Sequence, residues 1–353
     1  MYKVKNIYKP FLFLIDLIGY ALFFWIRFKK FDEEKIKKIL IIRLDHIGDV
    51  LLTTPTFRAL RNKFPKTKID VLVRPFTKEL LIGNKNINKV IALNPPWFSR
   101  EKTSILNLFE FIKNNFRKYD LVIELHADPR NIILALLVGT YRIGFGIRGF
   151  GFLLNKVARY DKKIKHQIER NLDVVSAIGA DTKNKELELN LTKKEISFAD
   201  KIFDKYKLKR AICINPGTGR IHKYWFNDRW AKVADTLIKK YNSKIILTGS
   251  KEDVKDCKEI YDFSKNKEKI INLCGETSLR QLAAIIKKCM LFLGPDTGPM
   301  HTARAVKTPL IGLFGPVDPR EWGYKEEKYK SLNRMFCLKR GAVNCECMKK
   351  NKC

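Results

Sequence analysis

The sequence lacks the glycine motifs that mark many nucleotide-dependent enzymes. No G-x-G-x-x-G follows the first strand-like segment of either half of the chain, and G-x-x-x-x-G-K-[S/T] is absent from all 353 residues. These absences argue against dinucleotide-dependent redox chemistry and against P-loop hydrolysis. The chain also has no low-complexity tract and no small-residue cleavage site after its N-terminal apolar segment, so we expect no removed signal peptide.

Acidic residues are scarce relative to basic ones. The chain carries 37 Asp and Glu against 70 Lys and Arg, which leaves a formal net charge of +33. Such a surface attracts polyanions, whether nucleic acid, anionic lipid headgroups or phosphorylated sugars. A Lys-rich proteome would produce the same excess, so charge alone names no partner. The basic residues are scattered, without the interleaved aromatic stripe of single-strand binders, and we therefore expect no nucleic acid partner.

The eight cysteines lack the paired C-x2-C spacing of common zinc sites. Four stand singly within strand-like or helix-like segments, namely Cys213, Cys257, Cys274 and Cys289. The other four cluster near the C-terminus with the spacing C-x7-C-x-C-x5-C, at Cys337, Cys345, Cys347 and Cys353. Nothing in the sequence indicates secretion, so we expect all eight to be reduced and no metal to be bound. A metal on the C-terminal four is the alternative.

An apolar segment near the N-terminus is too short for an ordinary membrane span. Residues 11–26 read FLFLIDLIGYALFFWI, contain Asp16 and Gly19, and have basic residues on both sides. As a helix they would extend roughly 24 Å, less than the ~30 Å hydrocarbon core of a bilayer. We expect a helix that lies in one leaflet, held by apolar burial and by its basic flanks on anionic headgroups. The alternative is a helix packed on the protein's own core.

From Lys38 onward, short β-branched runs alternate with amphipathic segments of helical period, and the pattern restarts after about residue 180. In the first half we expect strands at 38–43, 69–73, 89–93 and 120–125, helices at 49–63, 104–119 and 166–179, and an irregular segment at 139–165. In the second half we expect strands at 210–217, 244–249, 269–275, 290–296 and 309–315, and helices near 193–206, 227–241, 251–263, 279–289 and from about 298.

Strands that alternate with helices in this way predict an α/β fold with parallel sheets. We expect two Rossmann-like, doubly wound domains facing across a cleft, because such folds bind ligands at the carboxyl edges of their sheets. The predicted parts are a membrane-associating apolar helix, an N-terminal domain, a C-terminal domain and a Cys-rich tail. Their residue ranges are 1–36, 37–180, 181–325 and 326–353.

Three turns at the ends of expected strands in the second half are suited to phosphate. In NPGTGRIHKYWF (215–226), Thr218 and Gly219 lie in a tight turn that presents N–H groups, and Lys223 adds positive charge. GPDTGPMHTARA (294–305) opens a helix whose N-terminal N–H groups and dipole favour an anion. TGSKED (248–253) makes a third turn, in which Glu252 either bonds a ribose or is a first-turn helix acid. The alternatives are a basic surface loop and ordinary helix capping.

The first half opens with a different chemistry. LDHIGDVLLTTP (44–55) follows the apolar run KILIIR and places two carboxylates and an imidazole at a helix entrance. A carboxylate at a helix N-terminus tends to be ionised, as a general base must be. Asp49 is our candidate base, whereas Asp45 and His46 are either caps or contacts to an acceptor substrate.

These segments together resemble the heptosyltransferases of glycosyltransferase family 9, which are inverting enzymes of GT-B fold. The resemblance covers roughly residues 38–320 and rests on IRLDHIGDVLLTTPTFRALRNKFP, NPGTGRIHKYWFNDRWAKVADTL, LTGSKED, LCGETSLRQLAAII and GPDTGPMHTARAVKTPLIGLFGPVDP. The G-D pair at the first helix, the K-x-W loop and D-T-G-x-x-H, in that order, are jointly specific. The N-terminal apolar segment lies outside the shared region, and the Cys-rich tail replaces helices that many GT-B proteins have there.

The resemblance implies a role for each motif. Asp49 would be the catalytic base that deprotonates an acceptor hydroxyl, and Lys223 would offset the charge of the departing ADP. Donor-binding positions would be Thr218, Gly219, Lys223, Glu252, Asp296, Thr297, Gly298 and His301. Asp45 and His46 lie in a loop where the family varies, and they stay either caps or contacts to the acceptor. No metal and no cofactor is implied, because a basic side chain and a helix dipole do the work of Mg²⁺.

The sequence thus predicts an enzyme that moves heptose, or a related sugar, from an ADP-sugar donor to a lipid-linked saccharide in lipopolysaccharide core or cell-surface glycan biosynthesis. We expect it on the cytoplasmic face of the inner membrane, held to the anionic surface by its N-terminal helix. The alternatives are a GT-B enzyme that uses another nucleotide sugar, as a transferase or an epimerase, and a catalytically inactive binding protein. The sequence leaves the exact donor, the acceptor, the oligomeric state and the depth of membrane insertion open.

Overall fold

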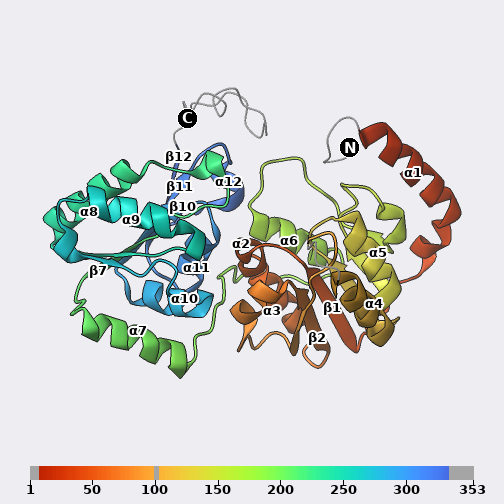
Figure 1. The fold of residues 1–353 in the computed structure, drawn as a ribbon. Coiled ribbons are helices and arrows are strands. Elements are labelled where there is room, and N and C mark those ends of the chain that lie inside the picture. The colour runs from red at the N-terminus through yellow and green to blue at the C-terminus, as the bar shows by residue number, and fades with distance from the viewer. Residues whose placement is uncertain (1–7, 99–102, 334–353) are drawn as a thin grey trace. The chain divides into compact units, whose positions relative to one another are not determined.

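The computed structural model describes residues 8–98 and 103–333 of the chain. The chain divides into two compact units, unit 1 at Met1–Glu186 and unit 2 at Leu187–Cys353. Each unit contains a six-stranded sheet in which every pair of neighbouring strands is parallel (Figure 1). Helices cover both faces of each sheet, which explains why the central strands are continuous apolar runs.

In unit 1 the strand order is β3-β2-β1-β4-β5-β6. The strands are β1 Lys38–Arg43, β2 Lys68–Val73, β3 Lys89–Ala92, β4 Tyr119–Glu124, β5 Gly139–Gly144 and β6 Lys156–Val157. The helices are α1 Lys9–Leu22, α2 Ile47–Leu51, α3 Thr54–Lys63, α4 Thr103–Asn115, α5 Pro129–Val138 and α6 Gln167–Ser176, with short 3-10 turns η2 Phe24–Phe28, η3 Pro75–Leu81 and η4 Gly151–Leu153. Side chains of α4 and α5 form one core with β1, β2 and β4, while α3 packs beside α6.

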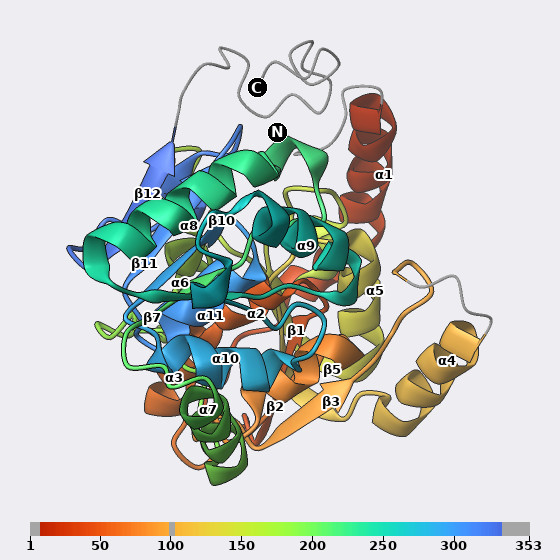
Figure 2. The same ribbon diagram turned by 60° about the vertical axis from the view of Figure 1, so that its left-hand side comes forward.

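In unit 2 the strand order is β12-β11-β10-β7-β8-β9. The strands are β7 Ala211–Ile214, β8 Lys244–Leu247, β9 Ile270–Asn272, β10 Leu291–Pro295, β11 Leu310–Phe314 and β12 Tyr329–Asn333. The helices are α7 Lys193–Lys205, α8 Asn227–Tyr241, α9 Val254–Phe263, α10 Leu279–Lys288, α11 Gly298–Ala305 and α12 Pro319–Trp322, with η5 Ile221–Lys223, η6 Lys251–Asp253 and η7 Lys267–Lys269. Helices α8 and α9 lie side by side, and α10 packs against α7 and α11 (Figure 2).

The prediction of one continuous helix at 49–63 is wrong. It consists of α2 and α3, which are separated at Leu52 and Thr53. Pro55 is the physical reason, because its ring has no N–H and would collide with the carbonyl of Leu51 in a continuous helix. Two hydroxyls satisfy the carbonyls around the break: Thr53 Oγ1 donates to the Asp49 carbonyl and Thr54 Oγ1 to the Leu51 carbonyl, both at 2.8 Å.

Four further elements, in three segments, differ from the prediction. The segment 139–165, expected to be irregular, contains strands β5 and β6. Helix α5 was not predicted, although Asp128 caps it by accepting a hydrogen bond from the Arg130 N–H and Pro129 occupies its first turn. Strand β12 lies within the range expected to be tail, and it pairs with β11.

The N-terminal apolar segment forms α1 followed by η2. No helix among residues 8–98 and 103–333 combines the length and the apolar character that a membrane crossing requires. The four C-terminal cysteines lie outside the described residues, and the other four are free and buried. Within the described part of the chain, no group of three or more His, Cys, Asp or Glu side chains is arranged to hold a metal ion.

Candidate active site

In unit 1, the candidate base is held by an arginine at the end of the central strand. Arg43 is the last residue of β1 and is only 2% exposed. Its Nη2 donates to Asp49 Oδ1 at 2.8 Å, and its Nη1 donates to the Leu125 carbonyl at 2.5 Å. The guanidinium therefore fixes the Asp49 carboxylate in the first turn of α2.

Asp45 joins the same network through its carboxylate, whereas His46 contacts it through its backbone N–H. Asp45 Oδ2 lies 3.8 Å from Arg43 Nη2 and 3.6 Å from His126 Nε2, and its Oδ1 accepts the His46 backbone N–H at 3.0 Å. Burial opposes ionisation of Asp45, but Arg43 and His126 outweigh it and lower the pKa of that carboxyl. His46 is the N-cap residue of α2, and its side chain is exposed.

The turn after β4 supplies site residues that the sequence reasoning missed. Glu124 is fully buried, and its carboxylate accepts the backbone N–H groups of His126 and Ala127 at 3.0 and 2.6 Å. Burial raises the pKa of Glu124 to about 7. Burial also lowers the pKa of His126, so its imidazole is mainly neutral. The letters ELHAD, which begin with the last residue of the buried strand β4, were the available signal, because parallel strands end at one edge of the sheet.

Two more arginines stand at this edge among aromatic rings. Arg74 follows β2 and lies 4.6 Å from the ring centre of Phe76 and 5.1 Å from that of Phe98. Arg130, in the first turn of α5, lies 5.8 Å from the ring centre of Phe98, and that ring stacks on His126. Stacking on a ring leaves the N–H donors of a guanidinium free for hydrogen bonds, and in Arg130 the Nε and Nη2 donors are used by the Asp128 carboxylate, at 2.8 and 2.5 Å. The carboxyl edge of unit 1 thus combines a fixed carboxylate with several cationic groups.

In unit 2, the three predicted turns lie at the carboxyl ends of adjacent strands β10, β7 and β8. Thr218 and Gly219 form the turn after β7, where Thr218 Oγ1 accepts the Arg220 N–H at 3.2 Å. Gly217 is required there, because a Cβ atom at this position would overlap the Asp253 carboxylate of the turn after β8. The backbone at Gly217 therefore lies directly against the Asp253 side chain, with no room for a Cβ atom between them.

Lys223 and Asp296 form an ion pair between two of these turns. The Lys223 ammonium donates to Asp296 Oδ2 at 2.6 Å and to the Asp296 carbonyl at 2.7 Å. The lysine side chain is 14% exposed and that of Asp296 is 6% exposed. Because Asp296 is the more buried partner, it serves to hold the lysine in position, and the ammonium is the charge that a ligand would meet.

His301 and the start of α11 complete this group. The His301 Nδ1 shares a 2.7 Å hydrogen bond with the hydroxyl of Tyr324, and its Nε2 lies 3.8 Å from Asp296 Oδ1. Burial raises the pKa of Tyr324 well above its ordinary value, so the phenol keeps its proton. Thr297 is the N-cap residue of α11 and Gly298 its first residue, without a side-chain cap. Tyr324 was not predicted as a site residue.

Glu252 lies apart from these buried contacts. It is exposed on η6, and a hydrogen bond with Ser250 lowers its pKa. The capping-box role on this turn belongs to Asp253, whose Oδ2 accepts the Ser250 N–H at 2.8 Å and the Ser250 hydroxyl at 2.7 Å. Glu252 lies with Asp253 in the first turn of η6, which is the alternative that the sequence left open for it.

Two parallel-sheet α/β units, one with a carboxylate at its sheet edge and one with phosphate-suited turns, fit the architecture of the GT-B glycosyltransferases, and the comparison with known families decides the class. The chain belongs to glycosyltransferase family 9 (heptosyltransferase), whose family model matches residues 107–352. The resemblance seen in the sequence is thereby confirmed. The matched range begins after Asp49, so the role of Asp49 rests on its motif and its geometry.

Relatives and solved structures agree with this family. The chain is 29% identical over 296 residues to lipopolysaccharide heptosyltransferase 3 of Escherichia coli strain K12, covering 78% of this chain and 81% of that protein. Its fold resembles a family 9 glycosyl transferase from Veillonella parvula DSM 2008, with TM-score 0.77, 27% identity, and 85% and 86% of the two chains covered. E. coli ADP-heptose lps heptosyltransferase II shares the fold, with TM-score 0.68, 24% identity, and 86% and 92% covered.

Proposed function

We propose that this enzyme transfers a heptose from an ADP-sugar to a lipid-linked saccharide acceptor of the lipopolysaccharide core, with inversion at the anomeric carbon. The observation that carries the proposal is the Asp49 carboxylate, which the buried Arg43 guanidinium holds 2.8 Å away at the carboxyl end of β1. Family membership and the heptosyltransferase name of the E. coli relative support the sugar and the pathway.

Unit 1 would supply the general base. Asp49 takes the proton of an acceptor hydroxyl while that oxygen forms a bond to the anomeric carbon of the donor. The bond from the anomeric carbon to the diphosphate oxygen breaks at the same time, and ADP departs with the electron pair. Because the new bond forms on the face opposite the departing group, the configuration inverts. The Arg43 contact keeps the carboxylate oriented.

Unit 2 would hold the donor and stabilise the departing ADP. The Lys223 ammonium, already fixed by Asp296, offsets the negative charge that develops on the diphosphate. The N–H groups at Thr218, Gly219 and the start of α11 provide further donors for phosphate oxygens. Thr297, Gly298 and His301 are proposed to contact the sugar and its phosphate, and the exposed carboxylate of Glu252 the ribose hydroxyls.

The acceptor is proposed to be anionic and membrane-borne. Arg74, Arg130 and His126 surround the Asp45 and Asp49 edge with cationic and aromatic groups, which supports recognition of phosphorylated or acidic sugars. Such an acceptor is made at the cytoplasmic face of the inner membrane, where we place the enzyme. Asp45 and His46 are proposed acceptor contacts.

The test compares Asp49→Asn with a matched control, Glu169→Gln. Glu169 is also a first-turn helix acid of unit 1 with an ion pair, 2.6 Å from Lys185, but it lies on α6. Asn at position 49 can still accept the Arg43 hydrogen bond, so folding and ADP-heptose binding by calorimetry should persist. We expect transfer to fall by about 10²-fold or more in Asp49→Asn and to stay unchanged in Glu169→Gln. Transfer retained by Asp49→Asn would refute the assignment of the base.

The donor and the stereochemistry are tested separately. The thermal shift caused by ADP-heptose should exceed that caused by UDP- and GDP-sugars at equal concentration, because a ligand that binds only the native state stabilises it more when its Kd is lower. NMR of the product should show the anomeric configuration opposite to that of the donor. A larger shift with a uridine donor would replace the ADP proposal, and retention would exclude a single displacement by the acceptor.

A further inference from the structure

Helix α1 packs on unit 1 with its polar and small residues inward. Asp16 and Gly19 are its buried residues, which reverses the usual pattern of a surface helix. Asp16 Oδ1 accepts the backbone N–H of Phe150 at 2.8 Å, and a Cβ atom on Gly19 would overlap the ring of Phe152. These two contacts set the rotation of the helix about its axis.

The rotation leaves a wide apolar surface pointing away from unit 1. Figure 1 shows α1 at the periphery of unit 1. Side chains that are 50–73% exposed follow one another along α1 and η2: Phe11, Phe13, Leu14, Leu17, Ile18, Leu22, Phe24, Trp25 and Phe28. We call this set the α1–η2 face. Contiguous exposed apolar surface on this scale marks a binding site for a protein or a membrane.

Basic residues border the α1–η2 face. Lys9 begins α1, while Arg27 and Lys30 lie exposed at its other end. A cavity of about 670 Å³ lies beside the helix and is lined by Lys9, Phe13, Tyr20 and Tyr160 among others. The segment that carries Tyr160 adds exposed Arg159, Lys162 and Lys163. An apolar surface with a cationic border matches acyl chains beneath anionic headgroups, whereas a protein groove would not need the border.

We propose that the α1–η2 face is an interfacial membrane anchor that inserts among the acyl chains of an anionic lipid bilayer, with the bordering Lys and Arg side chains on headgroup phosphates. The inward Asp16 and Gly19 explain how a helix of this composition stays attached to the protein while its apolar side remains outside. The anchor rests on its own contacts, so it holds or fails independently of the proposed sugar transfer.

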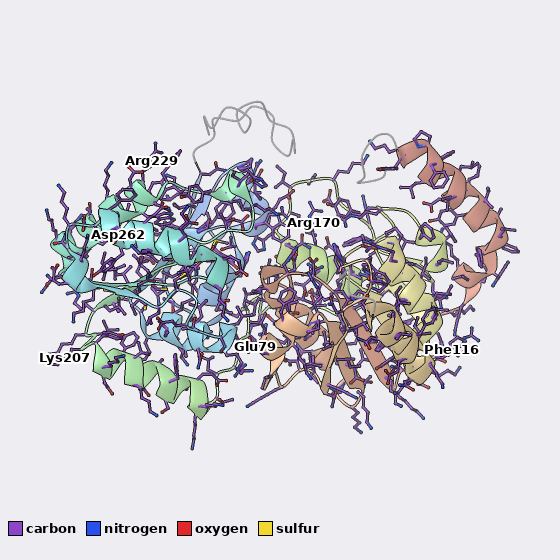
Figure 3. All side chains as sticks on the ribbon, viewed as in Figure 1. Glu79, Phe116, Arg170, Lys207, Arg229 and Asp262 are labelled. Carbon is purple, nitrogen blue, oxygen red and sulfur yellow. The ribbon has the colours of Figure 1, made fainter. Side chains whose placement is uncertain are left out.

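The test uses the full chain and two triple variants. Phe13→Ser, Leu17→Ser and Phe24→Ser together remove part of the α1–η2 face without touching its inward contacts. The matched control replaces exposed apolar residues on α4, with Ile105→Ser, Leu106→Ser and Phe109→Ser. Phe116, labelled in Figure 3 just beyond α4, shows that this second region is apolar as well. Each protein is sedimented with vesicles of phosphatidylethanolamine and phosphatidylglycerol, and with vesicles of phosphatidylcholine alone.

We expect the wild type to bind the anionic vesicles, less strongly at high salt, and the α1 triple variant to bind them about tenfold more weakly or worse. The α4 triple variant should bind as the wild type does. Unchanged binding by the α1 variant, or equal loss in both variants, would overturn the proposal. The proposal would also be overturned if the wild type did not bind vesicles but formed a dimer, and the α1 triple variant were a monomer. A second copy of the chain would then cover the α1–η2 face.

Transfer assays separate this surface from the reaction. On a water-soluble, deacylated acceptor, the α1 triple variant should match the wild type. On acceptor embedded in anionic vesicles, its rate should fall with its vesicle binding. An equal loss on both acceptors would show that the residues support catalysis or folding rather than membrane attachment.

Discussion

The buried Glu124 should make the stability of unit 1 depend on pH in an unusual direction. Its side chain is fully buried and lacks a cationic partner among the contacts that hold it, which are the N–H groups of His126 and Ala127 and the amide of Asn131. Burial raises its pKa from an ordinary 4.5 to about 7. The native protein therefore binds a proton that the unfolded chain releases, and rising pH destabilises it.

The magnitude follows from the two pKa values. The protonated carboxyl contributes its full stability below about pH 4.5, and this contribution is lost as pH rises through about 7. At about 1.4 kcal/mol per pKa unit the complete loss is about 3 kcal/mol, and about 2 kcal/mol of it falls between pH 5.5 and pH 8. Glu124→Gln cannot ionise, so this part of the pH dependence should disappear. The free energy of unfolding of the variant minus that of the wild type should therefore be about 2 kcal/mol larger at pH 8 than at pH 5.5.

The assay must report on unit 1 alone, because two units need not unfold together. Pulse-labelling hydrogen exchange in urea, read on peptides that cover β4, gives the free energy of unfolding at each pH. His126 acts in the opposite direction, since burial lowers its pKa, but both proteins contain it and its effect cancels. Glu169→Gln should follow the wild type at both pH values. If the difference between wild type and Glu124→Gln is the same at pH 5.5 and pH 8, the argument from burial is wrong.

Two more predictions concern the ion pairs of the proposed site. Arg43→Met leaves the Asp49 carboxylate and the Leu125 carbonyl without their partner, so urea unfolding should show a loss of about 3 kcal/mol or more, together with loss of transfer. Arg43→Lys keeps the positive charge but not the two-pronged guanidinium, so its stability and its transfer activity should lie between those of the wild type and Arg43→Met. Full activity in Arg43→Met would contradict the role of this contact. Lys223→Met should lower kcat by about 10²-fold or more and weaken ADP binding in calorimetry, with little change in vesicle sedimentation. Unaltered ADP affinity in that variant would remove Lys223 from the donor site.

The central strands were predictable because they are buried on both faces. KILIIR was expected as a strand at 38–43, and β1 has those bounds. A fully buried parallel strand needs an unbroken apolar run, and this local signal survives in one sequence. Helix α8 was likewise expected at 227–241 and has those bounds, because one apolar stripe and a break before the next strand define it.

The missed elements depend on contacts between distant residues. Helix α5 begins in ADPRN, which resembles a polar loop until the Asp128 cap and Pro129 are recognised as its first turn. The environment of Glu124 could not be predicted, since a glutamate at the end of a strand is ordinarily exposed, and its burial results from the packing of α5 and the turn at 125–127. The Arg43 contact to the Leu125 carbonyl joins residues 82 positions apart. No spacing rule contains that information.

The two ion pairs suggest a rule for which member meets a substrate. In unit 1, Arg43 is 2% exposed and Asp49 is 14% exposed. In unit 2 the order is reversed, because Lys223 is 14% exposed and Asp296 is 6% exposed. In each pair the buried member orients its partner and the more accessible member presents its charge. In the proposed reaction Asp49 would thus present a base at the edge of one sheet and Lys223 a cation at the edge of the other, which are the two charges that deprotonating an acceptor and releasing a diphosphate require.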